Sequence, residues 1–160
     1  MARAEVVVGL DNSMSARAAL RWAARQARLT GAVLRAVTIV DWSDYLSAEA
    51  GPPVSMDWLA LLPDQVDPAD RDRLQGIFDE VQPEAGWLVE FVAGDPGRVL
   101  VQASLDSELL VVGTGEHVGL DRLLVGSTSR YCLNHAACPV VMVPGTYANS
   151  ATTESSRGGD

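Results

Sequence analysis

The sequence predicts a single α/β domain built on an open, five-stranded parallel sheet with helices on both faces. Short apolar runs alternate along the chain with longer segments in which apolar residues recur at helical spacing, which is typical of this fold class. The apolar runs are nearly continuous, as expected for parallel strands that are buried on both sides. A chain of 160 residues is long enough for one such domain.

A strand, a helix and a second strand are predicted at the start of the chain. The apolar run Val6–Val8 stops at a glycine-containing turn, and the helix that follows carries an alanine stripe for the core and arginines for the solvated face. Ser13 or Ser15 can cap this helix, and Gly31 ends it. Residues 33–40 form the second strand, so a right-handed parallel crossover is expected.

Residues 41–67 interrupt this alternation. The segment is rich in prolines and acids and is too long for a simple connection, so we expect a variable insertion over the carboxyl end of the sheet. Its aromatic residues Trp42, Tyr45 and Trp58 either anchor the insertion or cover a ligand, and we favour anchoring.

Three further helices and three further strands are predicted before a polar tail. Their expected positions, in chain order, are a helix from Pro68 that ends before Pro83, a strand at 87–92, a helix at 97–105, a strand at Leu109–Val112, a helix at 127–135 and a last strand at Val140–Val143. Ser127 is the expected N-cap of the last helix, with Leu133 on its inward face. The domain therefore spans residues 1–145, and residues 146–160 form a disordered tail.

Composition and charge narrow the classes of function. The net charge is −9 without a basic stripe, which argues against nucleic acid or anionic lipid as a partner. No apolar run approaches the roughly 18 residues of a membrane span, and the N-terminus lacks the features of a signal peptide, so we expect a cytoplasmic protein. All twelve basic residues are arginine, which excludes a lysine nucleophile and a phosphate-binding lysine.

An anion site is predicted at the carboxyl ends of the first and fourth strands. The run Leu109–Val112 leads into a loop with Gly113 and Gly115, and Gly126 opens the next helix, an arrangement that suits an anion at a helix N-terminus. If the first and fourth strands are neighbours, Asp11 converges with these glycines on one crevice. Simpler interpretations stay open, in which the glycines only shape the loop and Asp11 only caps the first helix.

Other chemistry is less well supported. A P-loop needs a lysine, a dinucleotide fingerprint needs a glycine where Val118 stands, and the chain has no Gly-x-Ser-x-Gly elbow. Cys132, His135 and Cys138 have metal-like spacing, with His117 as a fourth candidate ligand. We favour free thiols in a reduced compartment and a His135 near the last carbonyls of its helix, and we predict no metal site.

Two stretches of the chain resemble the universal stress protein family. The opening VVVGLDNSMSARAALRWAARQA is similar to the family's valine run, Asp-Gly-Ser and alanine-rich helix, and residues 94–144 resemble the family's closing half. The resemblance covers about residues 4–144. It implies the strand order 3-2-1-4-5 and a cytoplasmic homodimer formed through the last strand, Val140–Val143.

The resemblance also implies an adenine nucleotide, ATP or AMP, with or without Mg²⁺. The family pattern Gly-x-x-Gly, nine residues, then Gly-Ser places its first glycine at Gly113 and its final pair at 126–127, but Glu116 replaces the second glycine and Asn12 replaces another. The implied nucleotide-binding residues are Gly9, Leu10, Asp11, Ile39, Val112, Gly113, Thr114, Gly115, Glu116, Gly126, Ser127, Thr128 and Ser129.

Glu116 sets the main alternative. A carboxylate about 6 Å from a phosphate charge repels it by about 2–3 kcal/mol at an effective dielectric near 20, which weakens binding roughly a hundredfold. We predict a dimeric, non-enzymatic stress-response sensor or regulator that binds the nucleotide. The alternatives are the same fold with a lapsed site that acts only through an unknown protein partner, and a slow nucleotide hydrolase relying on Asp11, Glu116 and His117.

Overall fold

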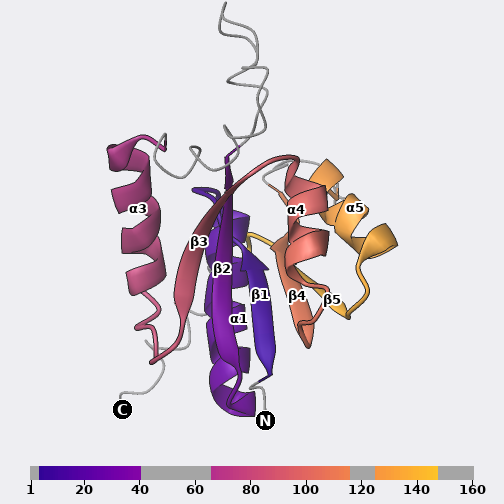
Figure 1. Ribbon diagram of the computed structural model, residues 1–160, viewed down its shortest axis with the longest axis horizontal. Helices are drawn as coiled ribbons and strands as arrows, with labels where there is room; N and C mark the ends of the chain where they lie inside the picture. The colour runs from indigo at the N-terminus through magenta and orange to yellow at the C-terminus, as the bar shows by residue number, and fades with distance from the viewer. Residues whose placement is uncertain (1–3, 41–65, 116–124, 148–160) are drawn as a thin grey trace, which may run out of the picture.

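The computed structural model describes residues 4–40, 66–115 and 125–147, and within them the chain forms one parallel sheet with helices on both faces (Figure 1). The strands are β1 (Glu5–Gly9), β2 (Val33–Val40), β3 (Leu88–Ala93), β4 (Leu109–Gly113) and β5 (Val140–Val143). The helices are α1 (Met14–Thr30), α3 (Pro68–Asp79), α4 (Pro96–Ala103) and α5 (Ser127–His135). The strand order is β3-β2-β1-β4-β5, so the predicted fold class and order are confirmed.

The central strand β1 is buried on both faces. Val6, Val7 and Val8 each expose 1% or less of their surface. Val6 and Val8 pack into the core that α1 and α3 cover, whereas Val7 faces the opposite core, beneath α4 and α5, as the period of two along a strand requires. Burying one such side chain stabilises the fold by about 1.5–3 kcal/mol. Because β1 contributes buried valines to both cores, it lies at the centre of the fold.

Helix α1 lies close to the sheet because the stripe it buries consists largely of alanine. Of the two predicted caps, Ser13 is the one found: its Oγ accepts a hydrogen bond from the Ala16 N–H at 3.1 Å. Gly31 ends the helix at φ 70°, a left-handed conformation that glycine adopts without strain. Both ends of α1 are therefore set by local sequence, as predicted.

The predicted inward face of the last helix was wrong by one residue. Leu133 is 50% exposed, and the neighbouring Cys132 is fully buried in its place. Ser129 and Cys132, three residues apart, form the inward face of α5. A shift of one residue rotates a helical position by about 100°, which moves Leu133 from the core to solvent.

Smaller differences occur at element ends. Helix α4 begins at Pro96 and is capped by Asp95, whose Oδ1 accepts from the Arg98 N–H at 3.0 Å; it ends at Ala103 rather than 105. Strand β3 begins one residue later than predicted, at Leu88. The predicted insertion lies outside the described residues except for its last two positions, and the predicted tail lies outside them from residue 148 onward. Tyr147 packs against the core on the α1 side.

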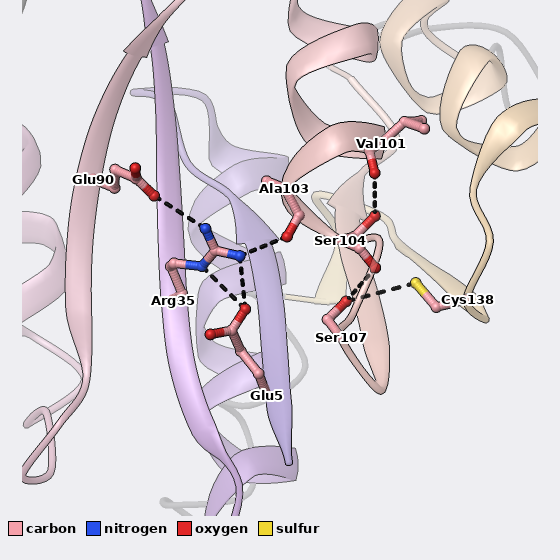
Figure 2. A network of polar contacts seen from close by, with 8 residues as sticks. All are labelled: Glu5, Arg35, Glu90, Val101, Ala103, Ser104, Ser107 and Cys138. Carbon is pink, nitrogen blue, oxygen red and sulfur yellow. Dashed lines mark hydrogen bonds and ion pairs between the residues drawn. The ribbon is translucent and has the colours of Figure 1, made fainter. Parts of the chain in front are cut away.

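One ion network joins three strands to the end of α4 (Figure 2). The Arg35 guanidinium lies 2.7 Å from the Glu5 carboxylate on β1 and 3.2 Å from Glu90 on β3, and it donates to the carbonyl of Ala103. Burial alone would lower the pKa of Arg35, but the two carboxylates outweigh burial and raise it. The network fixes the C-terminal end of α4, whose other end lines the cavity described below.

Replacing Arg35 by alanine is expected to lower the free energy of unfolding by about 1–3 kcal/mol, because two carboxylates and a carbonyl lose a partly buried donor. Arg73→Ala is the matched control, since Arg73 pairs with Asp70 on the exposed face of α3 and should cost about 0.5 kcal/mol or less. Urea unfolding of both variants measures the difference. Equal losses would show that the Arg35 network does not stabilise the fold.

Candidate functional site

A cavity of about 250 Å³ lies where β1 and β4, neighbours in the sheet, reach their carboxyl ends. Its walls come from the ends of β1, β2 and β4 and from the first turns of α1, α4 and α5. The lining residues are Gly9, Leu10, Asp11, Ser15, Ala16, Ile39, Pro96, Leu100, Val112, Gly113, Gly115, Gly126, Ser127, Thr128 and Ser129. The structure thus brings Asp11, Gly113 and Gly126 to one crevice, as the sheet order predicts.

All but two of the predicted site residues line this cavity. Thr114 is buried and does not line the cavity. Its carbonyl accepts a hydrogen bond from the Gly126 N–H at 3.2 Å, so it helps to position the start of α5. Glu116 lies outside the described residues. A larger cavity of about 670 Å³ lies beside the Arg35 network, and none of the predicted site residues that the structure describes lines it.

The sequence did not identify four lining residues as part of the site: Ser15, Ala16, Pro96 and Leu100. Ser15 and Ala16 were assigned to the cap and the apolar stripe of α1, and Pro96 to the start of α4. Leu100 reaches the cavity because it packs on Gly9, where a Cβ atom would lie 3.1 Å from Leu100 Cδ1. No local signal marks these residues, because their place depends on how helices dock on the sheet.

Asp11 supports the turn that leads into α1. Its Oδ1 accepts a hydrogen bond from the Ser13 N–H at 2.7 Å, while Ser13 itself caps the helix. Asp11 is therefore not the N-cap. Its side chain is exposed at the mouth of the cavity, and no hydrogen bond to Oδ2 is found within the described part of the chain. This second oxygen can accept a hydrogen bond from a ligand hydroxyl or amine.

Gly113 at the end of β4 and Gly115 just after it are explained without a ligand, by packing and by backbone conformation. A Cβ atom on Gly113 would lie 2.7 Å from both the backbone carbon and the Oγ of Ser15, so β4 and α1 can meet only through glycine here. Gly115 has φ 92°, a conformation that disfavours other residues. Gly113 and Gly115 therefore do not by themselves indicate a ligand.

The first turn of α5 is the clearest indication of an anion. Ser127 was the predicted N-cap, and this prediction was wrong, because Ser127 is the first helical residue. The N-cap is Gly126, and since glycine has no side chain, no side-chain oxygen caps the first turn. The N–H groups of a first turn have no partner inside the helix. Within the described residues, α1, α3 and α4 each have a side-chain cap, from Ser13, Asp67 and Asp95.

The position of α5 directs these donors to the cavity. Ser127, Thr128 and Ser129 all line it, and Ser129 Oγ donates to the Gly113 carbonyl at 2.7 Å, which ties the helix to the end of β4. Unpaired N–H groups and the positive end of the helix dipole favour an anion there. Among the lining residues that the structure describes, Asp11 is the only charged side chain, so an anion would be held by neutral donors.

Cys132, His135 and Cys138 do not line the cavity. His135 stacks on Tyr131 with ring centroids 4.0 Å apart, and its Nδ1 lies 2.9 Å from the Tyr131 carbonyl, so the predicted helix-end histidine is confirmed. No group of three or more His, Cys, Asp or Glu side chains in the described ranges is placed to hold a metal, and His117 lies outside them.

No described helix is long and apolar enough to cross a membrane.

Comparison with known proteins decides the family. The model of the universal stress protein family matches residues 3–144. The chain belongs to the universal stress protein family. A universal stress protein of Mycolicibacterium smegmatis is 32% identical over 150 residues, which cover 88% of this chain and 48% of that protein. One from Mycobacterium tuberculosis is 30% identical over 149 residues, which cover 86% of this chain and 46% of that protein. This universal stress protein therefore spans about half the length of those relatives.

Solved structures of universal stress proteins share the fold. One from Lactobacillus plantarum is 25% identical with a TM-score of 0.65, covering 89% of this chain and 99% of that one. A universal stress protein in complex with cAMP is 22% identical with a TM-score of 0.56, covering 91% and 99%. One from Archaeoglobus fulgidus in complex with dAMP is 20% identical with a TM-score of 0.58, covering 89% and 99%. The family resemblance predicted from the sequence is confirmed.

The two cysteines of this universal stress protein should differ in reactivity. Burial, reinforced by the Asp95 carboxylate, raises the pKa of Cys132 to about 11, and Cys138 is partly exposed. Iodoacetamide at pH 8 should therefore modify Cys138 and leave Cys132 intact until the protein unfolds, as peptide mass spectrometry would show.

The same shift has a consequence for stability. The unfolded thiol ionises near pH 8.5, whereas folded Cys132 keeps its proton, so this group lowers the free energy of unfolding as the pH rises from about 9 toward 11. Cys132→Ser, which removes that titration, should flatten the decline. Rapid alkylation of Cys132 in the folded protein would contradict its burial.

Proposed function

We propose that this universal stress protein is a dimeric, cytoplasmic stress-response regulator that binds an adenine nucleotide in the cavity between β1 and β4. The observation that carries the proposal is the uncapped first turn of α5. It faces a cavity whose other described walls are apolar side chains and glycine backbone, apart from Asp11 and Ser15. A nucleotide has the matching chemistry, because it joins a flat apolar base to an anionic phosphate.

The walls of the cavity divide into two halves. Leu10, Ile39 and Val112 supply apolar surface for a base, with Asp11 at the mouth as an acceptor for polar groups of the nucleoside. Ser127 and Thr128 supply hydroxyl and N–H donors for a phosphate. Each hydrogen bond to a charged group contributes about 1.5–3 kcal/mol to binding. Several of them together are enough to bring the Kd of a nucleotide into the micromolar range.

The adenine nucleotide is supported by the solved relatives, two of which are complexes with cAMP and with dAMP. Both are under 25% identical to this chain, so they support the ligand class through the shared fold rather than through matched residues. AMP is the favoured ligand, since no described lining residue is cationic and each further phosphate adds negative charge. ATP would then bind best with Mg²⁺, which offsets that charge.

A regulatory role rather than catalysis is part of the proposal. A hydrolase needs a base that activates water, and Asp11 is the only titratable side chain among the described lining residues. The lapsed-site alternative is favoured by one observation: Gly113 and Gly115 are both explained by packing and backbone geometry without a ligand.

Titration calorimetry with AMP, and with ATP in the presence and absence of Mg²⁺, tests the nucleotide site. The wild type should bind AMP with a micromolar Kd, and Glu116→Gly should bind up to about a hundredfold more tightly if its carboxylate lies near the phosphate. Glu84→Gly, which removes an exposed carboxylate away from the cavity, should bind like the wild type. Binding by Glu116→Gly alone would favour a lapsed site, and no binding by any variant would overturn the proposal.

The dimer is proposed to form through β5. This strand is at the edge of the sheet, and Val140, Val141 and Met142 are only partly buried. Pro139 and Pro144 flank it, which limits pairing to a short edge. We expect sedimentation equilibrium to give twice the chain mass of 17.0 kDa. Met142→Glu should shift this toward the monomer, whereas Leu133→Glu on the exposed face of α5 should not; a wild-type monomer would contradict the proposal.

A further inference from the structure

Ser15 lies at a junction of three segments at the inner end of the cavity. Its side chain is buried, with 2% of the residue exposed, and its Oγ accepts a hydrogen bond from the Gly115 N–H at 3.2 Å. The close approach of Gly113 to Ser15 brings the end of β4 to the same point. Gly145, just after β5, also approaches Ser15, since a Cβ atom on it would lie 3.6 Å from the Ser15 nitrogen.

The segment 113–115, which Ser15 contacts, also positions α5. The Gly113 carbonyl accepts from Ser129 Oγ at 2.7 Å, and the Thr114 carbonyl accepts from the Gly126 N–H at 3.2 Å. These two contacts attach the N-cap and the first turn of α5 to the loop. The only hydrogen bond from Gly115 to α1 among the described residues is the one to Ser15, and it holds Gly115 in its left-handed conformation.

Ser15 is also connected to the opposite wall of the cavity. Its Oγ lies 3.4 Å from Ser13 Oγ, and the Ser13 N–H donates to Asp11 at 2.7 Å. A continuous series of polar contacts therefore runs from Asp11, at the end of β1, to Gly115, at the end of β4. The series is buried where it reaches Ser15. Leaving the Gly115 N–H without an acceptor there would be costly.

We propose that Ser15 is the positioning residue for the phosphate half of the nucleotide site: by holding Gly115, it fixes residues 113–115, whose carbonyls set the first turn of α5. The proposal rests on the proposed function and deepens it. Ser15 is not expected to contribute to recognition of the base, which the apolar wall of Leu10 and Ile39 provides. Its loss should therefore weaken binding of a nucleotide but not of the corresponding nucleoside.

Ser15→Ala tests this, with Ser104→Ala as the matched control. Ser104 is as deeply buried, at 0% exposed, and its Oγ donates to the Val101 carbonyl at 3.1 Å (Figure 2). Ser104 does not line the cavity. Calorimetry with AMP and with adenosine should show AMP binding about three- to tenfold weaker in Ser15→Ala, the loss expected for one hydrogen bond. Adenosine binding should change less than about twofold, and Ser104→Ala should change neither.

The outcomes separate the two proposals. An unchanged or tighter AMP affinity in Ser15→Ala, or an equal loss for AMP and adenosine, would overturn the role of Ser15 while leaving the nucleotide site intact. A wild type that binds neither ligand would overturn the proposed function and, with it, this role.

Amide hydrogen exchange supplies a readout without any nucleotide. In the free protein, Ser15→Ala should speed exchange of the Gly115 and Gly126 amides by about three- to tenfold, because the loop loses its contact with α1. Ser104→Ala should leave both rates unchanged. Exchange rates at Gly115 and Gly126 that are the same in Ser15→Ala and the wild type would overturn the proposed role.

Discussion

Gly113 brings the carboxyl end of β4 against the first turn of α1, and the shape of the cavity depends on that contact. A Cβ atom there would lie 2.7 Å from two atoms of Ser15, so any other residue would push the strand and the helix apart. Because β1 and β4 are neighbours, this approach also fixes the distance across the crevice between Asp11 and the loop. The start of α5 then follows from the two hydrogen bonds that the loop carbonyls accept.

The proposed phosphate site has no cationic side chain among its described lining residues. The chain carries a net charge of −9, and the described lining offers neutral donors rather than arginine. Such a site relies on N–H groups that the fold has already oriented, so little order is lost when a phosphate binds. The consequence is that affinity should depend on the geometry of the loop and of the first turn of α5, which gives a hydroxyl group such as that of Ser15 influence over binding.

The sequence predicted the features that local physics controls. Continuous apolar runs marked the five strands, and Gly31 marked the end of α1. The strand ends and the glycines pointed to Asp11, Gly113, Gly115 and Gly126 in the cavity, whereas the other predicted lining residues came from the family resemblance. The strand order came from the family resemblance. Features that depend on docking were missed: Ser15 and Leu100 reach the cavity only because two helices pack on the sheet. Leu133 was misplaced because α5 is short, so one residue of phase decides which side chain is buried.

The central claim is that the first turn of α5 receives the phosphate of an adenine nucleotide. Backbone ¹⁵N chemical shifts of Ser127, Thr128 and Ser129 during parallel titrations with AMP and adenosine test it most directly. We expect these amides to shift with AMP and to stay nearly fixed with adenosine, while the capped first turn of α3, which does not line the cavity, responds to neither. AMP binding that leaves the α5 amides unmoved, or that shifts them no more than adenosine does, would contradict the claim.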